Sequence, residues 1–180
     1  LDLTPESRVL DLCAGNGLFA MEIARQGAQV HCVDVSPDLL ASIDTETFPA
    51  IATQCADMRD VSFPTEAFTH IFLYAGIQYL TLAGAVNLLR RCYEWLEPGG
   101  KLFLGDVPDL QRRWAFYNTP ERRSAYFERV REEEDVIGTW FERSWLTYLG
   151  EDIGFRSLRV SDQPASQIYA HYRFDMELDK

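Results

Sequence analysis

The chain has 180 residues, a formal net charge of −11 and 47% hydrophobic residues, so we expect one globular domain over 1–180 and not a disordered chain. The acidic charge disfavours a nucleic-acid partner, and no apolar run reaches the roughly 18 residues that a membrane span requires. The start of the chain is too short and too polar for a signal peptide, and the four cysteines form no CxxC pair, so we expect a cytoplasmic protein without disulfides or a metal site.

Short apolar runs alternate with amphipathic segments in the first half of the chain, which predicts a parallel α/β sheet. Ser36 followed by Pro37 is typical of a helix start. The pattern predicts strands over residues 8–12, 29–33, 50–55, 68–74 and 101–105. It predicts helices over residues 17–26, 37–46 and 83–95, the last of them ended by the turn 97–100.

The second half is rich in arginine, glutamate and aromatic residues, and it predicts a helical insertion over 109–138 and a helix over 140–152. Two final strands are expected over 156–160 and 168–174, and the short linker between them favours an antiparallel pair. The predicted fold is a doubly wound, mostly parallel seven-stranded sheet of the Rossmann-like type, with an antiparallel C-terminal strand.

The sharpest local signal is the segment VLDLCAGNG over 9–17, where a strand ends in a glycine-rich turn that opens a helix. Glycine lets the backbone approach a ligand closely, and the helix start offers free N–H groups to an anion. Gly15, Gly17 and Ala20 also fit a dinucleotide fingerprint, with Asp34 where a ribose-binding acid belongs. Asp11 before the turn and Asp57 after the third strand are unusual for that fingerprint and favour a different cofactor.

Five segments in the same order resemble the motifs of the class I S-adenosylmethionine-dependent methyltransferases: 9–17, 30–39, 56–58, 68–80 and 96–104. The resemblance implies an enzyme that uses S-adenosyl-L-methionine. The sequence departs from the family pattern at Ala14 and Asn16; the family often has glycine, cysteine or serine at these two positions.

The resemblance also implies a role for each matching position. The backbone around four residues would hold the methionine part of the cofactor: Asp11, Ala14, Gly15 and Gly17. Asp34 would accept hydrogen bonds from the ribose hydroxyls. The adenine would lie against Asp57, Met58 and Val35. Leu73 and Tyr74 would close the floor of the site.

Methyl transfer needs mainly the alignment of an acceptor atom behind an activated methyl group, so a catalytic motif is not required. Asp106, at the end of the fifth strand, is a candidate general base, and Gln78 and Tyr79 follow the fourth strand on the same side. His171 falls inside a predicted strand, where a structural role is the simpler interpretation.

The region 109–131 carries six arginines against three acids, and aromatic residues lie between them. We expect it to roof the acceptor pocket and to favour an anionic small molecule, held by Arg112, Arg113, Arg122 or Arg123. A solvated helix pair whose arginines bind Glu132–Glu134 would give the same pattern.

The predicted function is O- or N-methylation of a small molecule. The alternatives are an NAD(P)-dependent oxidoreductase and a cofactor-binding module without catalysis. Because few residues precede the first strand, we also expect the chain to be a trimmed piece that lacks a lid helix, with weak cofactor binding. The sequence does not determine the oligomeric state.

Overall fold

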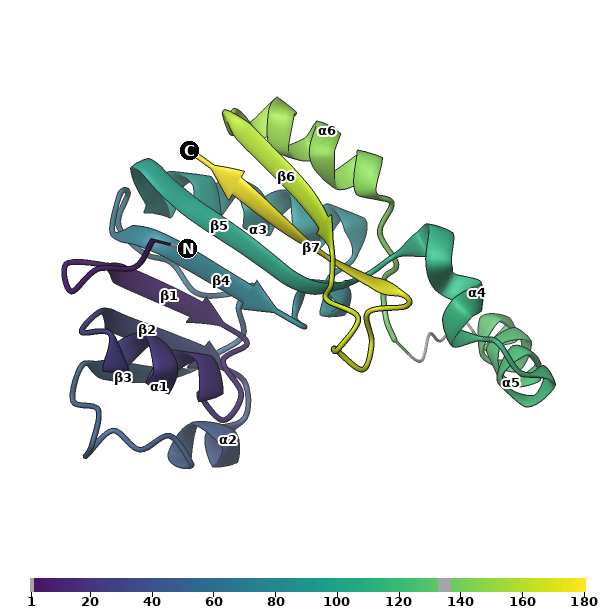
Figure 1. Cartoon of the computed structure of the whole chain (residues 1–180), viewed down its shortest axis with the longest axis horizontal. Helices are drawn as coiled ribbons and strands as arrows, with labels where there is room; N and C mark the ends of the chain where they lie inside the picture. The colour runs from purple at the N-terminus through teal and green to yellow at the C-terminus, as the bar shows by residue number, and fades with distance from the viewer. Residues whose placement is uncertain (1, 133–136) are drawn as a thin grey trace.

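A single seven-stranded sheet organises the protein (Figure 1). The computed structural model describes residues 2–132 and 137–180. The strand order is β3-β2-β1-β4-β5-β7-β6, and β7 runs antiparallel to both of its neighbours, as the sequence predicted. The strands are β1 Arg8–Leu12, β2 Gln29–Asp34, β3 Ile51–Cys55, β4 Phe68–Tyr74, β5 Leu96–Pro108, β6 Ser157–Asp162 and β7 Arg173–Asp179.

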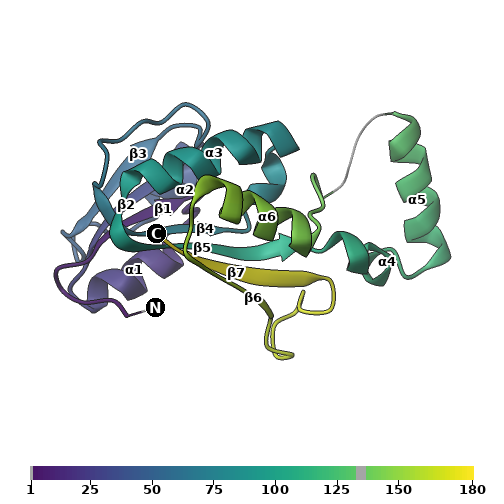
Figure 2. The ribbon, with the colours of Figure 1, turned by 90° about the horizontal axis from the view of Figure 1, so that it is seen from above.

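Helices cover both faces of the sheet, with α3 and α6 on one side and α1 on the other (Figure 2). Leu10 and Leu12 of β1 pack with the α3 and α6 side, whereas Val9 packs with α1 and α2, because side chains alternate along a strand. None of the helices in the described residues is long and apolar enough to cross a membrane. The helices are α1 Leu18–Arg25, α2 Pro37–Ala41, α3 Leu82–Trp95, α4 Arg113–Phe116, α5 Pro120–Arg131 and α6 Arg143–Ile153; two short 3₁₀ turns, η1 Ile77–Tyr79 and η2 Leu110–Arg112, complete the elements.

The strand order reverses between β1 and β4, which lie side by side although four elements separate them along the chain. Leu12, the last residue of β1, pairs with Val33 on one side and with Leu73 on the other. The carboxyl ends of these three strands therefore meet at one edge, and this is where open α/β sheets bind ligands.

The second helix, the fifth strand and the last strand differ most from their predicted bounds, and β5 runs over Leu96–Pro108 instead of 101–105. The helix expected over 37–46 ends at Ala41, because the Ser42 hydroxyl donates to the Leu39 carbonyl and Asp44 accepts from the Thr47 amide in a tight turn. The last strand runs over Arg173–Asp179, not 168–174, and the chain before it forms turns that leave His171 exposed. Charged residues alternate with the buried Met176 and Leu178 in this strand, so its sequence looks polar although one face is buried.

The predicted turn 97–100 lies within the irregular beginning of β5, which shifts register against β4 between Phe68 and His70. The predicted helical insertion is helical in α4 and α5, which extend beyond the carboxyl ends of the strands (Figures 1 and 2). Residues 133–136 of that insertion lie outside the described residues. A separate aromatic cluster of Tyr117, Trp140 and Tyr172 anchors α4 to the edge of the sheet.

Candidate functional site

A cavity of about 480 Å³ opens where β1, β2, β3 and β4 end. We call it the strand-end cavity, and its volume lies within the range of small-molecule pockets, roughly 300–1,000 Å³. Its lining residues are Cys13, Val33, Asp34, Val35, Ser36, Leu39, Ala56, Asp57, Met58, Arg59, Tyr74, Ala75 and Tyr79. Of the predicted site residues, this set brings together Asp34, Val35, Asp57, Met58, Tyr74 and Tyr79.

Asp34 at the end of β2 ties two backbone segments together. One carboxylate oxygen accepts from the Gly15 amide at 2.8 Å and the other from the Ser36 amide at 2.9 Å. Gly15 and Gly17 both have left-handed backbone angles, with φ of 55° and 72°. The carboxylate therefore fixes the glycine-rich turn, and its remaining lone pairs can accept from a ligand in the cavity.

Asp11 lies beneath that turn, only 3% exposed. Burial, followed by the nearby charge of Asp34, raises the pKa of Asp11 to about 7. Its Oδ2 atom has no hydrogen-bond partner among the described residues. A buried carboxylate oxygen without a donor is costly, so this atom is a place where a donor group of a ligand would be stabilised.

Asp57, after β3, forms an ion pair with Arg59. Arg59 donates to both of its carboxylate oxygens, at 2.9 and 2.6 Å, and this lowers the pKa of Asp57. Met58 beside it is buried, and its sulfur lies 3.5 Å from the Cys13 thiol. Val35 is 64% exposed at the rim. The cavity thus combines an acidic edge with an apolar surface.

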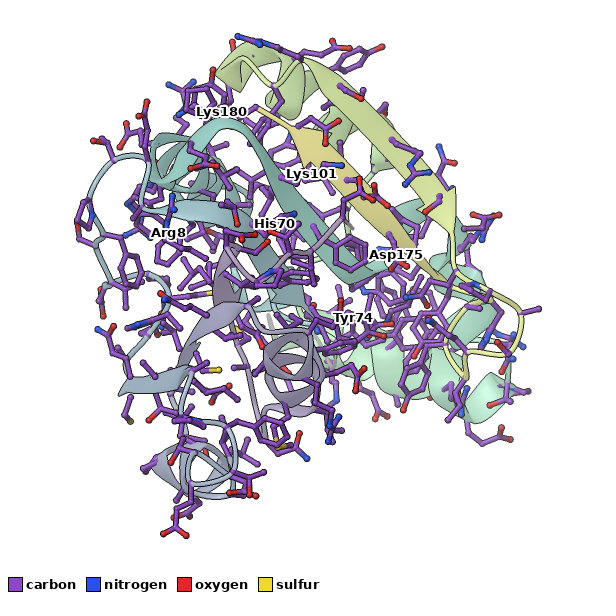
Figure 3. All side chains as sticks on the ribbon, turned by 60° about the vertical axis from the view of Figure 1, so that its left-hand side comes forward. Arg8, His70, Tyr74, Lys101, Asp175 and Lys180 are labelled. Atoms are coloured by element: carbon purple, nitrogen blue, oxygen red, sulfur yellow. The ribbon has the colours of Figure 1, made fainter. Side chains whose placement is uncertain are left out.

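Leu73 and Tyr74 have different positions at the end of β4. Leu73 is fully buried in the core and does not line the cavity, because its side chain points to the α3 face. Tyr74 lines the cavity and packs on Phe19 of α1, with ring centroids 4.7 Å apart. Burial, and then the charges of Asp106 and Asp175, raise the pKa of Tyr74, which lies on the face drawn in Figure 3.

Backbone strain gathers at the same edge. Cys13, Ala75 and Asp106 have positive φ angles of 60°, 50° and 57°, and they follow or interrupt the neighbouring strands β1, β4 and β5. Positive φ angles are unfavourable for residues that have a Cβ atom, and such strained residues cluster at functional sites. No sequence signal marks these three residues, since the usual indicator of a left-handed residue is glycine.

A second cavity, of about 650 Å³, lies beside the first, and Tyr79 lines both. We call it the η1 cavity, and its lining residues are Gln78, Tyr79, Leu80, Thr81, Leu110, Arg113, Ile137, Gly138, Thr139 and Trp140. Thr139 closes one wall, because its amide donates to the Gln78 carbonyl at 2.9 Å and its hydroxyl donates to the Leu80 carbonyl at 2.6 Å. At Gly138, φ is +91° and a Cβ would collide with the Gln78 carbonyl oxygen.

The three predicted catalytic residues separate into two groups. Gln78 and Tyr79 line the η1 cavity, and the Gln78 amide nitrogen donates to the Ala75 carbonyl at 2.7 Å. Asp106 lines neither cavity: it is 6% exposed, and its carboxylate lies 3.2 Å from the Arg173 guanidinium and accepts from Gln163. Burial raises the pKa of Asp106, and the charge of Arg173 opposes that rise.

The four arginines predicted to hold an anion do not gather at one site. Arg112 pairs with Asp162 at 3.0 Å, and Arg122 donates to the Phe116 carbonyl. Only Arg113 of these four lines the η1 cavity. Within the described residues, no group of three or more His, Cys, Asp or Glu side chains could hold a metal ion.

The residues of the strand-end cavity, together with Asp11 buried beneath the glycine-rich turn beside it, fit a nucleoside with an attached amino acid. Asp34 can accept from vicinal hydroxyls, Val35 and Leu39 can cover a flat base, and the unpartnered Asp11 oxygen can receive an ammonium group. A family model described as "Methyltransferase domain" matches residues 9–100. The chain belongs to the methyltransferase domain family. Its cofactor is S-adenosyl-L-methionine, which confirms that prediction and removes the NAD(P) alternative.

Relatives and solved structures agree with this assignment. A phosphoethanolamine N-methyltransferase of Plasmodium falciparum is 29% identical over 76% of this methyltransferase domain and 54% of the relative. A demethylmenaquinone methyltransferase of Corynebacterium urealyticum is 33% identical over 59% of the domain and 44% of the relative. The domain thus spans about half the length of these curated relatives.

The fold is shared with more distant methyltransferases. A structure from Mesorhizobium loti, described as an S-adenosylmethionine-dependent methyltransferase, has a TM-score of 0.76 at 16% identity and covers all of this domain and 94% of that chain. A SAM-dependent methyltransferase from Methanosarcina mazei has a TM-score of 0.73, also at 16% identity, over 99% of the domain and 94% of that chain. The predicted Rossmann-like methyltransferase fold is therefore confirmed.

Proposed function

We propose that this protein transfers the methyl group of S-adenosyl-L-methionine to an oxygen or nitrogen atom of a small molecule bound in the η1 cavity. The observation that carries this proposal is that Tyr79 lines both cavities. A cofactor in one cavity and an acceptor in the other would meet beside this residue, as direct transfer between two bound molecules requires.

The cofactor supplies a methyl group already activated on a sulfonium, and the protein has to hold and orient it. Asp34 would accept from the ribose hydroxyls while it keeps the Gly15 turn in place. Asp57 would receive the adenine amino group on the part of its carboxylate that Arg59 leaves free, beside Met58. Ala14, Gly15 and Gly17 would shape the turn around the methionine part, and the unpartnered Asp11 oxygen would attract its ammonium group.

The acceptor would be oriented by Gln78 and Tyr79. The Oε1 atom of Gln78 is buried and has no partner among the described residues, although its amide nitrogen is held by the Ala75 carbonyl. Asp106 was predicted as a general base, but here its carboxylate is held by Arg173. We propose that Asp106 is a positioning residue that holds β5 against β7 through Arg173 and Gln163, and that the described part of the insertion roofs the acceptor through Arg113.

Both transfer chemistries have a counterpart among the relatives. The relatives include a phosphoethanolamine N-methyltransferase from Plasmodium falciparum and a ubiquinone biosynthesis O-methyltransferase from Xanthomonas oryzae pv. oryzae. The predicted cytoplasmic location and the absence of a nucleic-acid partner stay predictions.

The test is a methyl-transfer assay with labelled S-adenosyl-L-methionine against a panel of small phenols, amines and carboxylates, together with calorimetry using S-adenosylhomocysteine. We expect S-adenosylhomocysteine to bind and at least one acceptor class to be methylated, with Asp34→Ala weakening both signals. Binding without transfer to any acceptor would favour the alternative, a cofactor-binding module without catalysis. No binding of either cofactor form would contradict the proposal.

A further inference from the structure

The η1 cavity contains one charged side chain among its lining residues, and that side chain is a cation. Arg113 stands among polar and apolar neighbours such as Gln78, Thr139 and Trp140, and no acid lines the cavity within the described residues. The chain as a whole carries a net charge of −11. A cavity whose described lining carries a single positive charge in so acidic a protein concentrates anions locally.

The surroundings of Arg113 differ from those of the neighbouring arginines. Arg112 and Arg143 share the carboxylates of Asp109 and Asp162, at 2.6 to 3.6 Å. Arg113 has no such ion pair among the described residues; its guanidinium instead lies over the rings of Trp114 and Tyr126, at 5.0 and 5.1 Å from their centroids. Stacking on these rings holds the plane of the Arg113 guanidinium in place and leaves the N–H groups at its edge available for a carboxylate or phosphate.

Buried polar atoms without partners also gather at this cavity. Three of its lining residues carry one each within the described part of the chain: Gln78 Oε1, Arg113 Nε and Trp140 Nε1. Gln78 and Trp140 are 6% and 7% exposed, so these are built-in features of the wall and not surface groups. Buried polar groups are almost always paired, which indicates that this wall is completed by a polar ligand.

We propose that the η1 cavity selects acceptors that carry a carboxylate or phosphate group, bound by the Arg113 guanidinium, with a flat or apolar part beside Trp140. This inference rests on the proposed function only in identifying the bound molecule as the methyl acceptor. Two charge-assisted hydrogen bonds from the guanidinium to the anionic group fix the orientation of the acceptor. The remaining donors and acceptors of the cavity wall would form hydrogen bonds with the rest of the acceptor.

Matched probes separate charge recognition from shape. Benzoate, phenyl phosphate and the uncharged benzamide are titrated into the full chain saturated with S-adenosylhomocysteine, and binding is followed by NMR. We expect benzoate or phenyl phosphate to bind at least about tenfold more tightly than benzamide, a ratio equivalent to about 1.4 kcal/mol. The stronger of the two anions identifies the group that the cavity prefers.

The same ratio is then measured in variants. Arg113→Gln should bring the affinity ratio of anion to benzamide close to one, Arg113→Lys should keep part of it, and Arg122→Gln should leave it unchanged, since Arg122 donates to the Phe116 carbonyl. Because the ratio is internal to each variant, general loss of affinity does not alter it. Equal binding of benzoate, phenyl phosphate and benzamide by the wild type, or an unchanged ratio in Arg113→Gln, would overturn the inference.

The affinity for S-adenosylhomocysteine is measured in parallel and tests the proposed function alone. A variant that keeps this affinity while losing the anion preference supports both proposals. Anion preference at Arg113 in a protein that does not bind S-adenosylhomocysteine would contradict the proposed function and leave the anion site established.

Discussion

The two cavities are built in different ways. The strand-end cavity takes its polar groups from turns that directly follow β1, β2 and β3, with Asp34 bonded to the Gly15 amide across neighbouring strands. The η1 cavity is assembled from η1, α4 and residues 137–140, which are joined by contacts such as Thr139 to Gln78. The strand-end cavity, proposed for the cofactor, is therefore formed by local turn geometry in adjacent strands, whereas the η1 cavity, proposed for the acceptor, depends on packing between distant segments.

The largest expected effect concerns Asp11, which is buried beneath the glycine-rich turn beside the strand-end cavity. Its pKa is raised to about 7 in the folded state, so the folded state binds the proton more tightly than the unfolded state does. This stabilisation is complete below the ordinary value of 3.8 and is lost as pH rises through about 7. We expect the wild type to lose up to a few kcal/mol relative to Asp11→Asn between acidic and neutral pH.

Urea unfolding of both proteins at about pH 5.5 and about pH 8, without cofactor, measures this difference. Saturating S-adenosylhomocysteine, whose ammonium group would offset the buried charge, should reduce it. Parallel pH profiles of the two proteins would show that Asp11 does not titrate in this range.

Removing the Asp34 carboxylate should separate the two cavities functionally. Asp34→Ala is expected to weaken S-adenosylhomocysteine binding by about 10- to 100-fold, since hydrogen bonds to a charged group contribute about 1.5–3 kcal/mol. The free energy of unfolding should also fall, because the Gly15 and Ser36 amides lose their acceptor. Calorimetry and thermal unfolding measure both effects.

Asp38→Ala is the matched control, because Asp38 is an exposed acid on α2. Its affinity for S-adenosylhomocysteine should equal that of the wild type. An Asp34→Ala variant that binds as tightly as this control would mean that the ribose is held elsewhere.

The converse change targets the η1 cavity. Gly138→Ala adds a Cβ against the Gln78 carbonyl oxygen at a left-handed φ of +91°, which should destabilise the segment by roughly 1–3 kcal/mol. We expect faster hydrogen exchange at the Thr139 amide, which donates to that carbonyl, with unchanged S-adenosylhomocysteine affinity. Gly99→Ala, at φ +83° with nothing near its Cβ, isolates the backbone contribution.

If Gly138→Ala weakened cofactor binding as much as Asp34→Ala does, the two cavities would be energetically coupled, and they would not be formed independently of each other.

The smallest expected effect tests the strain at the shared edge. Ala75 has a φ of 50°, so Ala75→Gly should raise the free energy of unfolding by roughly 0.5–1 kcal/mol. Ala52→Gly, at an exposed position in β3, should lower it by a similar amount, because glycine in a strand only adds flexibility to the unfolded chain. Thermal unfolding of both variants provides the test, and a shift of the same sign in both would exclude strain at Ala75.

Much of the strand-end cavity could be predicted because each part lies within a few residues of a strand end. Asp34, Asp57, Met58 and Tyr74 all line it as the motifs implied. Arg59 was missed, although its position two residues after Asp57 suits a local ion pair. Leu73 was misplaced because alternation along β4 sends its side chain into the core, and this depends on which face each helix covers.

The prediction for Asp106 shows where sequence reasoning ends. Asp106 was predicted to follow the fifth strand, but it lies within β5, where the antiparallel β7 brings Arg173 to 3.2 Å from its carboxylate. The register of β5 with β7 shifts between Leu104 and Val107, and this irregularity turns Asp106 toward Arg173 and Gln163. A pairing between residues so far apart in the chain leaves no local signature.

The sequence by itself determined the order of strands and helices, the glycine-rich turn and the acids at the ends of the first strands, because these depend on short-range periodicity and on residues next to strand ends. Only the tertiary structure decided which arginine lines the η1 cavity and which residues carry strain. These features arise from long-range packing of α4, η1 and residues 137–140, where the position of a side chain depends on neighbours distant in sequence.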